Sequence, residues 1–184
     1  MESDNINQIS IIICLYTGVR IGELCGLRWS DIDFERRLLQ VQRTVHRIKN
    51  VEDDRKTKVI CLLPKSDMSN RDIPLPDFLI SFLKEHCKIS NSDYVVSSNK
   101  SHLEPRTIQR RFKRMLSITN LRDINFHTGT RHTFATRALE KGFDIKVLSE
   151  ILGHSSVTFT LNKYANVLDD HKRKSMELLE ELYK

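Results

Sequence analysis

Apolar residues recur at two different spacings along this chain, and the change between them predicts the fold class. Near the amino terminus they fall three or four positions apart, as on the buried face of an α-helix: Ile6, Ile9, Ile12, Ile13 and Tyr16. Residues 38–75 instead carry short alternating or β-branched runs typical of strands. The helical spacing returns from residue 77 onward. The sequence therefore predicts a mainly helical α+β protein with a small antiparallel sheet near residues 38–75.

The strand region is expected to form a hairpin. Residues 38–48 and 59–63 would be its strands, joined by the polar loop 50–58, and residues 73–75 would add a short strand. Glycines mark the expected ends of three helices, since glycine readily closes a helix in the left-handed conformation: Gly18, Gly142 and Gly153. The first of these leaves Arg20 just beyond a helix end.

Length and composition limit the class of protein. The 184 residues fit one compact domain, without an internal repeat or a Gly/Ser linker. Thirty lysines and arginines against 24 acidic residues give a net charge of +6, which favours an acidic partner, either nucleic acid or an anionic membrane surface. The four cysteines are widely spaced in apolar surroundings and are expected to be reduced. With neither a membrane-length apolar run nor a basic leader to a secretory signal, we expect a cytoplasmic protein.

Tyr164 stands ten residues after His154, and two further stretches supply histidines and arginines. A phenol has an ordinary pKa of about 10, so it attacks as a nucleophile only with a base beside it and cations facing the developing charge. The stretch 17–20 ends in Arg20, and the stretch 127–132 contains His127, Arg131 and His132. These are the residue types that such a reaction requires.

The helix expected from residue 106 to about 116 separates its chemistry by face. Its cationic side carries Arg106, Arg110 and Lys113, and its apolar side carries Ile108, Phe112 and Met115. A cationic helix face is commonly a solvated surface. It is also suited to lie along a DNA phosphate backbone, and the helix is a candidate DNA contact.

Four dispersed motifs occur in one order along nearly the whole chain. They are TGVRIGEL at 17–24, continuing as LRWSDID at 27–33, then RHTFAT at 131–136, LGH at 152–154, and the tyrosine at 164. Together they resemble the signature boxes of the tyrosine recombinases, the phage integrase family, and are most similar to integrases of temperate phages and conjugative transposons. The resemblance implies the catalytic domain of a site-specific DNA recombinase.

The resemblance also implies six catalytic residues: Arg20, Lys65, His127, Arg131, His154 and Tyr164. Lys65 is assigned because residues 64–75 resemble the family's stretch from the hairpin lysine to Ile-Pro-Leu. The chain departs from the family pattern in one place, with three residues instead of two between His127 and Arg131. If Arg131 opens a helix, a preceding loop can absorb the extra residue through unusual dihedrals at Gly129. His132 is a rival for the role of His127.

The implied reaction needs no metal or other cofactor. The two arginines would hold a DNA phosphate, Tyr164 would form a 3′-phosphotyrosyl bond, and His127 would accept the phenol proton. Lys65 would protonate the departing 5′ oxygen, and His154 would stabilise the transition state. The histidine and cysteine spacings do not match a zinc site. The alternative function is a DNA-binding regulator that retains the fold with impaired cleavage, which the shifted His127 would support.

We expect residues 1–184 to be a single catalytic domain, without the amino-terminal core-binding and arm-binding domains of other family members. Residues 169–184 are expected to form a helix with Met176, Leu179 and Tyr183 on one side. In the family such tails dock on a neighbouring catalytic domain within a tetramer assembled on DNA. Docking onto its own domain is the other possibility, and alone the fragment is expected to be a monomer or weak oligomer.

Overall fold

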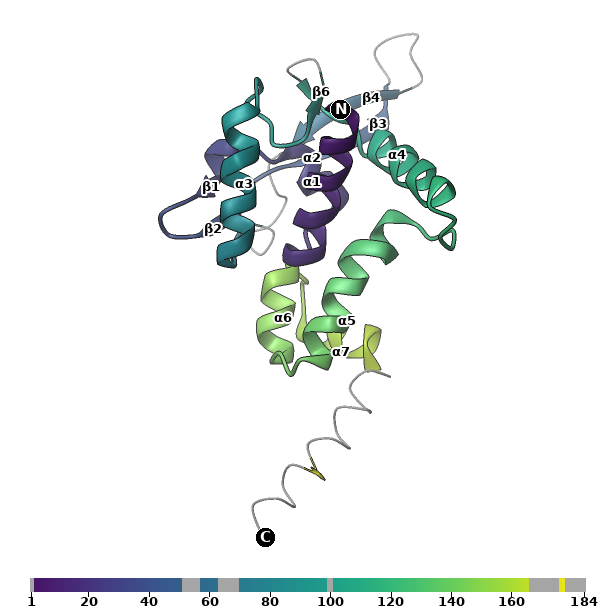
Figure 1. Ribbon diagram of the computed structural model, residues 1–184. Coiled ribbons are helices and arrows are strands. Elements are labelled where there is room, and N and C mark those ends of the chain that lie inside the picture. The colour runs from purple at the N-terminus through teal and green to yellow at the C-terminus, as the bar shows by residue number, and fades with distance from the viewer. Residues whose placement is uncertain (1, 51–56, 63–69, 99–100, 166–175, 178–184) are drawn as a thin grey trace.

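The computed structural model describes residues 2–50, 57–62, 70–98, 101–165 and 176–177, with side chains described from residue 6. Its elements confirm a mainly helical α+β fold with small antiparallel sheets (Figure 1). The helices are α1 (Glu2–Thr17), α2 (Ile21–Gly26), α3 (Asp77–Ile89), α4 (Pro105–Ile118), α5 (Thr133–Glu140), α6 (Ile145–Leu152) and α7 (Val157–Lys163). The strands are β1 (Ile32–Asp33), β2 (Leu38–Val41), β3 (Thr44–Lys49), β4 (Thr57–Leu62), β5 (Arg71–Pro74), β6 (Ser97–Ser98) and β7 (Ser101–His102).

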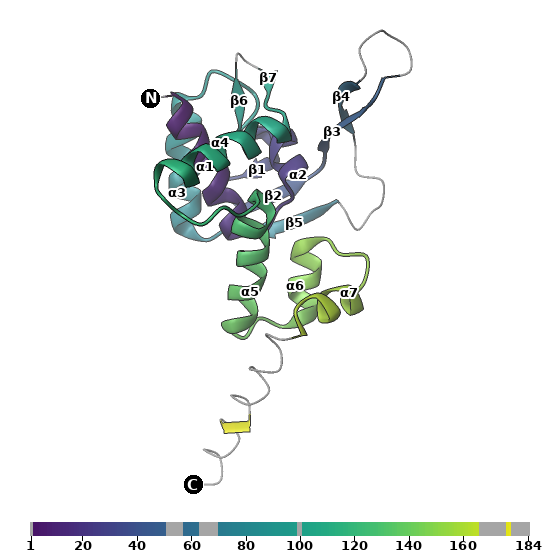
Figure 2. The ribbon, with the colours of Figure 1, turned by 90° about the vertical axis from the view of Figure 1, so that its right-hand side faces the viewer.

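The predicted hairpin is present, but the prediction of one continuous first strand is wrong. Residues 38–48 form two strands in different sheets, separated at Gln42 and Arg43. β3 pairs with β4 as the hairpin, whereas β2 lies between β1 and β5 in a three-stranded antiparallel sheet. The hairpin projects away from the helices (Figure 2). Leu39, Val41 and Val45 are all buried at odd-numbered positions, so the apolar pattern has the same phase on both sides of the break and did not reveal it.

Most of the buried core surrounds α1. Ile9 and Ile13 of this helix pack with residues from α2, α3, α4 and the three-stranded sheet, and Ile13 has no exposed surface. A second cluster joins α5, α6 and α7, which lie together below the main core in Figure 1. Its buried residues are Ala135, Ala138, Leu139, Leu148, Leu152 and Tyr164. The candidate nucleophile, which follows α7, is therefore packed against α5 and α6.

The three predicted helix-ending glycines are confirmed. Gly18, Gly142 and Gly153 all have positive φ angles, of 65°, 83° and 61°. Arg20 follows the first of them as the residue that precedes α2. No helix in the described part of the chain is both long and apolar enough to cross a membrane.

The segment between His127 and Arg131 differs from the prediction. Arg131 does not open a helix, because helical structure already starts at Phe126 and continues through a π-helical turn, Thr128–His132, into α5. A π turn accommodates one additional residue within a helix, so the extra residue is absorbed by helix and not by a loop. Gly129 has no positive φ angle. It is required for close packing, since a Cβ atom there would lie 2.8 Å from Phe112 Cζ.

Candidate active site

Three arginine side chains from distant parts of the sequence meet at the C-terminal end of α6. Each donates a hydrogen bond to one of three successive backbone carbonyl oxygens: Arg71 Nε to Ile151 (2.6 Å), Arg131 Nη2 to Leu152 (2.7 Å) and Arg20 Nη2 to Gly153 (2.9 Å). The last carbonyl groups of a helix have no partner within it and form the negative end of its dipole. Three guanidinium groups therefore lie together at the end of α6, next to the residue that precedes His154.

Arg20 is held by Glu23 at the start of α2. The Glu23 carboxylate accepts from Arg20 Nη1 (2.8 Å) and from the Arg20 backbone N–H (2.8 Å). Burial raises the pKa of Glu23, but hydrogen bonding and charge from Arg71 and Arg20 outweigh it, so the pKa lies below its ordinary value. Glu23 is thus ionised at neutral pH. The Arg20 side chain remains 41% exposed and can reach a ligand.

Arg131 is almost completely buried, at 3% exposure. Its Nη1 donates to the Gly18 carbonyl at 2.5 Å, and its Nη2 binds the Leu152 carbonyl. Burial, followed by the charge of Arg20, lowers the Arg131 pKa to about 9, partly opposed by Glu23. The guanidinium still carries its charge at neutral pH, and these two contacts fix its orientation.

His154 lies on the turn after α6 and is buried. Its Nδ1 is 2.7 Å from the hydroxyl oxygen of Thr160, and its ring meets the Phe159 ring edge-on. Burial and then the charges of Arg131 and Arg20 lower the His154 pKa to about 4, so the ring is neutral at pH 7. When Thr160 donates to Nδ1, the ring proton is on Nε2, which can donate to a ligand.

For the DNA cleavage that the family resemblance implies, we predict that Thr160→Val lowers the rate about fivefold, because His154 loses one orienting hydrogen bond of about 1 kcal/mol. The hydroxyl is replaced by a methyl group of similar volume, so α7 should remain folded. Single-turnover cleavage is the measurement, with Thr158→Val on the exposed side of α7 as the control. Equal rates for the two variants would show that Thr160 does not orient His154.

Tyr164 follows α7 and is buried, at 3% exposure. Its ring stacks on His132 with the centroids 5.2 Å apart and the planes 23° from parallel. Burial raises the phenol pKa, although the Arg131 charge acts in the opposite direction. The phenol is therefore protonated at neutral pH and needs a base in order to react. The stacking gives His132 a packing role beside the tyrosine.

His127 lies at the start of the π-helical turn and is exposed. Burial of part of the ring, followed by the charges of Lys163 and Arg131, lowers its pKa from the ordinary histidine value. A neutral imidazole can accept a proton. His127 thus combines access to ligand with the protonation state of a general base.

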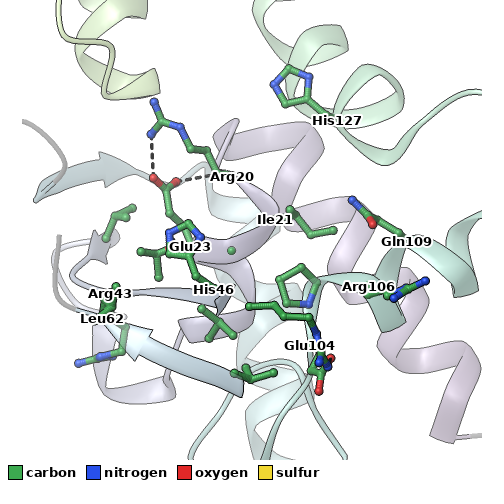
Figure 3. A pocket seen from close by; sticks show the side chains of 17 residues that line it. Arg20, Ile21, Glu23, Arg43, His46, Leu62, Glu104, Arg106, Gln109 and His127 are labelled. Atoms are coloured by element: carbon green, nitrogen blue, oxygen red, sulfur yellow. Dashed lines mark hydrogen bonds and ion pairs between the residues drawn. The ribbon is translucent and has the colours of Figure 1, made fainter. Parts of the chain in front are cut away.

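A groove of about 810 Å³ connects Arg20 and His127 with the hairpin and the start of α4. Figure 3 shows Arg20 and His127 in its upper part, with Gln109 and Arg106 following along α4. Its polar and charged lining residues are Arg20, Glu23, Arg43, Thr44, His46, Arg47, Glu104, Arg106, Gln109 and His127. Of the three arginines at the end of α6, Arg20 lines this groove.

Of the three α4 residues proposed for DNA contact, one lines the groove and two lie outside it. Arg106 lines the groove, but Arg110 and Lys113 do not, although both are exposed on the same helix. Lys113 instead forms an ion pair with Asp123. The hairpin side of the groove was not predicted from the sequence, although β3 contributes the polar residues Thr44, His46 and Arg47 to it.

Several predicted features fall on residues whose structure is not described. Lys65 lies outside the described residues, and so does the helix expected at 169–184 except for 176–177. Among the described residues, no group of three histidine, cysteine or acidic side chains is placed to bind a metal ion.

Gly153→Ala is predicted to destabilise the protein by about 2 kcal/mol, because an L-residue is strained at a φ of 61°. The added methyl would also lie 2.9 Å from Arg71 Nη1, so it should disturb the turn that carries His154 and reduce cleavage. Urea unfolding and single-turnover cleavage are the two measurements. Gly142→Ala is the matched control, since φ is 83° at that exposed position outside the site. It should lose stability but retain cleavage, and an equal loss of cleavage in both variants would contradict the local explanation.

The fold thus places the cluster of arginines at the end of α6 in the same part of the molecule as the buried Tyr164. The family model for the phage integrase family matches residues 2–171, and the chain belongs to that family. Several curated relatives are named tyrosine recombinases. The XerC-like recombinase of Caldanaerobacter subterraneus subsp. tengcongensis is 33% identical, over 94% of this chain and 48% of the relative. Tyrosine recombinase XerA of Pyrococcus furiosus is 33% identical, over 99% of this chain and 59% of the relative.

Solved structures show the same fold. The integrase of transposon Tn1549, in complex with transposon right-end DNA, superposes with a TM-score of 0.77 and 29% identity. That match covers 94% of this chain and 58% of the integrase chain. The chain thus spans about half the length of the curated relatives it matches.

Proposed function

We propose that this chain is the catalytic part of a tyrosine-type site-specific recombinase, which cleaves and rejoins DNA to integrate or excise a phage or mobile element. The observation that carries the proposal is the convergence of Arg20, Arg131 and His154 on one turn, in the same part of the fold as the buried Tyr164. Family membership and DNA-bound structural neighbours support the same function.

The proposed reaction begins when a DNA phosphate enters beside the arginines. Arg20 and Arg131 bind its non-bridging oxygens, for which forked, permanently charged guanidinium groups are well suited. His154 Nε2 donates to the same phosphate as negative charge develops. Tyr164 attacks phosphorus and forms a 3′-phosphotyrosyl bond, while the phosphorus–5′ oxygen bond breaks.

Two proton transfers complete the step. His127 accepts the phenol proton, and Lys65, assigned from the family resemblance, supplies a proton to the departing 5′ oxygen. The covalent bond conserves the energy of the phosphodiester, so attack by the 5′-hydroxyl of another strand can rejoin DNA without a nucleotide or metal. We propose double-stranded DNA as the partner, a DNA-bound tetramer linked through residues 169–184, and a cytoplasmic location.

The direct test is incubation with nicked suicide substrates that carry candidate core DNA, in the presence of a chelator. A nick close to the cleavage site lets the short 5′-hydroxyl strand diffuse away, so the covalent intermediate accumulates. Denaturing electrophoresis should reveal a protein–DNA adduct. DNA binding without an adduct across many substrates would instead favour the regulator. The π-helical turn weakens that alternative, because it absorbs the extra residue while His127 still lines the groove.

The pH dependence should reveal His127 in its neutral form. Since burial and the nearby cations lower the pKa of His127, kcat/KM, which reports free-enzyme groups, should decline only below the ordinary histidine range as pH falls. Lys163→Gln removes one of these cations, so the decline should move to higher pH. Lys141→Gln, on the exposed end of α5, should leave the profile unchanged. A profile unaffected by Lys163→Gln would contradict the assignment of His127 as the base.

A further inference from the structure

Arg71 is a buried arginine that the proposed reaction does not use. It opens β5, and only 7% of its side chain is exposed. Its Nη2 and Nη1 donate to the two carboxylate oxygens of Glu23, at 2.9 and 3.2 Å, and its Nε donates to the Ile151 carbonyl at 2.6 Å. One side chain thus joins a strand, the start of α2 and the end of α6.

Glu23 is shared between two guanidinium groups. Its Oε1 accepts from both Arg71 Nη1 and Arg20 Nη1, and its Oε2 accepts from Arg71 Nη2 and the Arg20 backbone N–H. The set of Arg71, Glu23 and Arg20 therefore carries one net positive charge. Without Arg71, the Glu23 carboxylate would compensate Arg20 alone and weaken its attraction for a phosphate.

Arg71 also supports the turn that carries His154. A Cβ atom at Gly153 would lie 2.9 to 3.1 Å from three Arg71 atoms, so the guanidinium packs directly against this turn. Gly153 accepts the hydrogen bond from Arg20, and His154 follows it. A displacement of Arg71 would therefore be transmitted to Arg20 by two routes, one through Glu23 and one through the turn.

We infer that Arg71 is a positioning residue for phosphate binding and cleavage: it shares the Glu23 carboxylate with Arg20 and holds the α6 turn, so that Arg20 and His154 face the phosphate with fixed geometry and charge. The inference rests on the proposed recombinase function. A buried ion pair with a purely structural role would affect stability and DNA binding, but it would not specifically slow the chemical step.

The first experiment measures single-turnover cleavage and DNA affinity for Arg71→Gln, with thermal unfolding as the folding check. We expect cleavage to fall about a hundredfold, whereas DNA affinity should fall only about twofold, because the Arg20 contact is one of many phosphate contacts that contribute to binding. Arg71→Lys retains charge but not the forked donors, and should fall between wild type and Arg71→Gln. Arg137→Gln, which removes an exposed ion pair with Glu140, is the charge-matched control and should cleave normally.

The double variant Glu23→Gln/Arg71→Gln tests whether Arg71 acts through Glu23. It contains no Glu23 carboxylate to neutralise the charge of Arg20, so it should cleave about tenfold faster than Arg71→Gln alone. Cleavage by Arg71→Gln at the wild-type rate would overturn the inference. The inference would also be overturned if Arg71→Gln lost stability, DNA affinity and cleavage to the same degree and the double variant restored none of them.

A second experiment needs no activity. Carbon-detected NMR titration of the Glu23 carboxyl group should show a higher pKa in Arg71→Gln than in wild type, because burial would no longer be opposed by the largest favourable contact. The other groups that face Glu23 are Arg20, Arg131 and the Cys14 thiol, and all are retained in this variant. An unchanged Glu23 titration would overturn the role of Arg71. If wild type forms no adduct, the recombinase proposal fails, while this titration still tests whether Arg71 controls the charge of Glu23.

Discussion

Arg131→Ala is expected to reduce single-turnover cleavage by about 10²- to 10³-fold, the usual effect of removing one group that stabilises a transition state. It should also destabilise the protein by about 2 to 4 kcal/mol, because the buried Gly18 and Leu152 carbonyls would lose their side-chain partner. The two losses have one origin, since the contacts that hold Arg131 in place are also contacts of the fold.

Arg131→Lys separates these two effects. Lysine retains the positive charge, but it cannot bind both carbonyls in the geometry of a guanidinium. We expect it to recover part of the stability and little of the cleavage. Urea unfolding and suicide-substrate cleavage provide the measurements, and Arg137→Ala on the exposed face of α5 is the control. Cleavage by Arg131→Ala at a rate close to wild type would exclude Arg131 from the phosphate site.

Tyr164→Phe is expected to abolish the covalent adduct while leaving DNA affinity within about twofold of wild type. Phenylalanine keeps the ring that stacks on His132 and fills the α5–α7 core, so the fold should be retained. Only the attacking oxygen is removed.

The control is Tyr16→Phe, which removes a hydroxyl from an exposed tyrosine on α1. Electrophoresis of suicide-substrate reactions under denaturing conditions measures the adduct, and fluorescence anisotropy measures DNA affinity. Adduct formation by Tyr164→Phe would show that another residue is the nucleophile. Loss of DNA affinity in this variant would instead indicate that the hydroxyl has a binding role.

Local features of the fold were predictable where one residue determines the backbone. Gly18, Gly142 and Gly153 were expected to end helices, and all three have the required positive φ angle. The break between β2 and β3 was not predictable, because the buried residues Val41 and Val45 keep the same alternating phase on both sides of it. Its position depends on which strands pair, and that is decided by tertiary structure.

The π-helical turn illustrates a different limit. The count of residues between His127 and Arg131 revealed an insertion, and Gly129 indicated where the chain would tolerate it. The insertion was expected to lie in a loop, whereas the helix continues through it as a π-helical turn. The glycine is needed for its small size against Phe112 and not for its dihedral angles.

Within the site, the sequence predicted only those residues that belong to the family motifs. Arg20, Arg131 and His154 meet at the end of α6, as four motifs in fixed order implied. Arg71 and Thr160 were missed as functional residues. Arg71 lies within the stretch used to assign Lys65, so its position in that stretch was the available signal. Thr160 had none, because a threonine within a helix is common and its bond to His154 depends on the turn between them.

The measurement that tests the central claim most directly is mass-spectrometric mapping of the covalent adduct. After formation in chelator, digestion with nuclease and trypsin should leave a nucleotide remnant on the peptide of residues 164–172, which begins after Lys163. We predict a 3′-phosphate linkage to Tyr164. A remnant on any other residue, or a linkage through a 5′-phosphate, would contradict the proposed reaction.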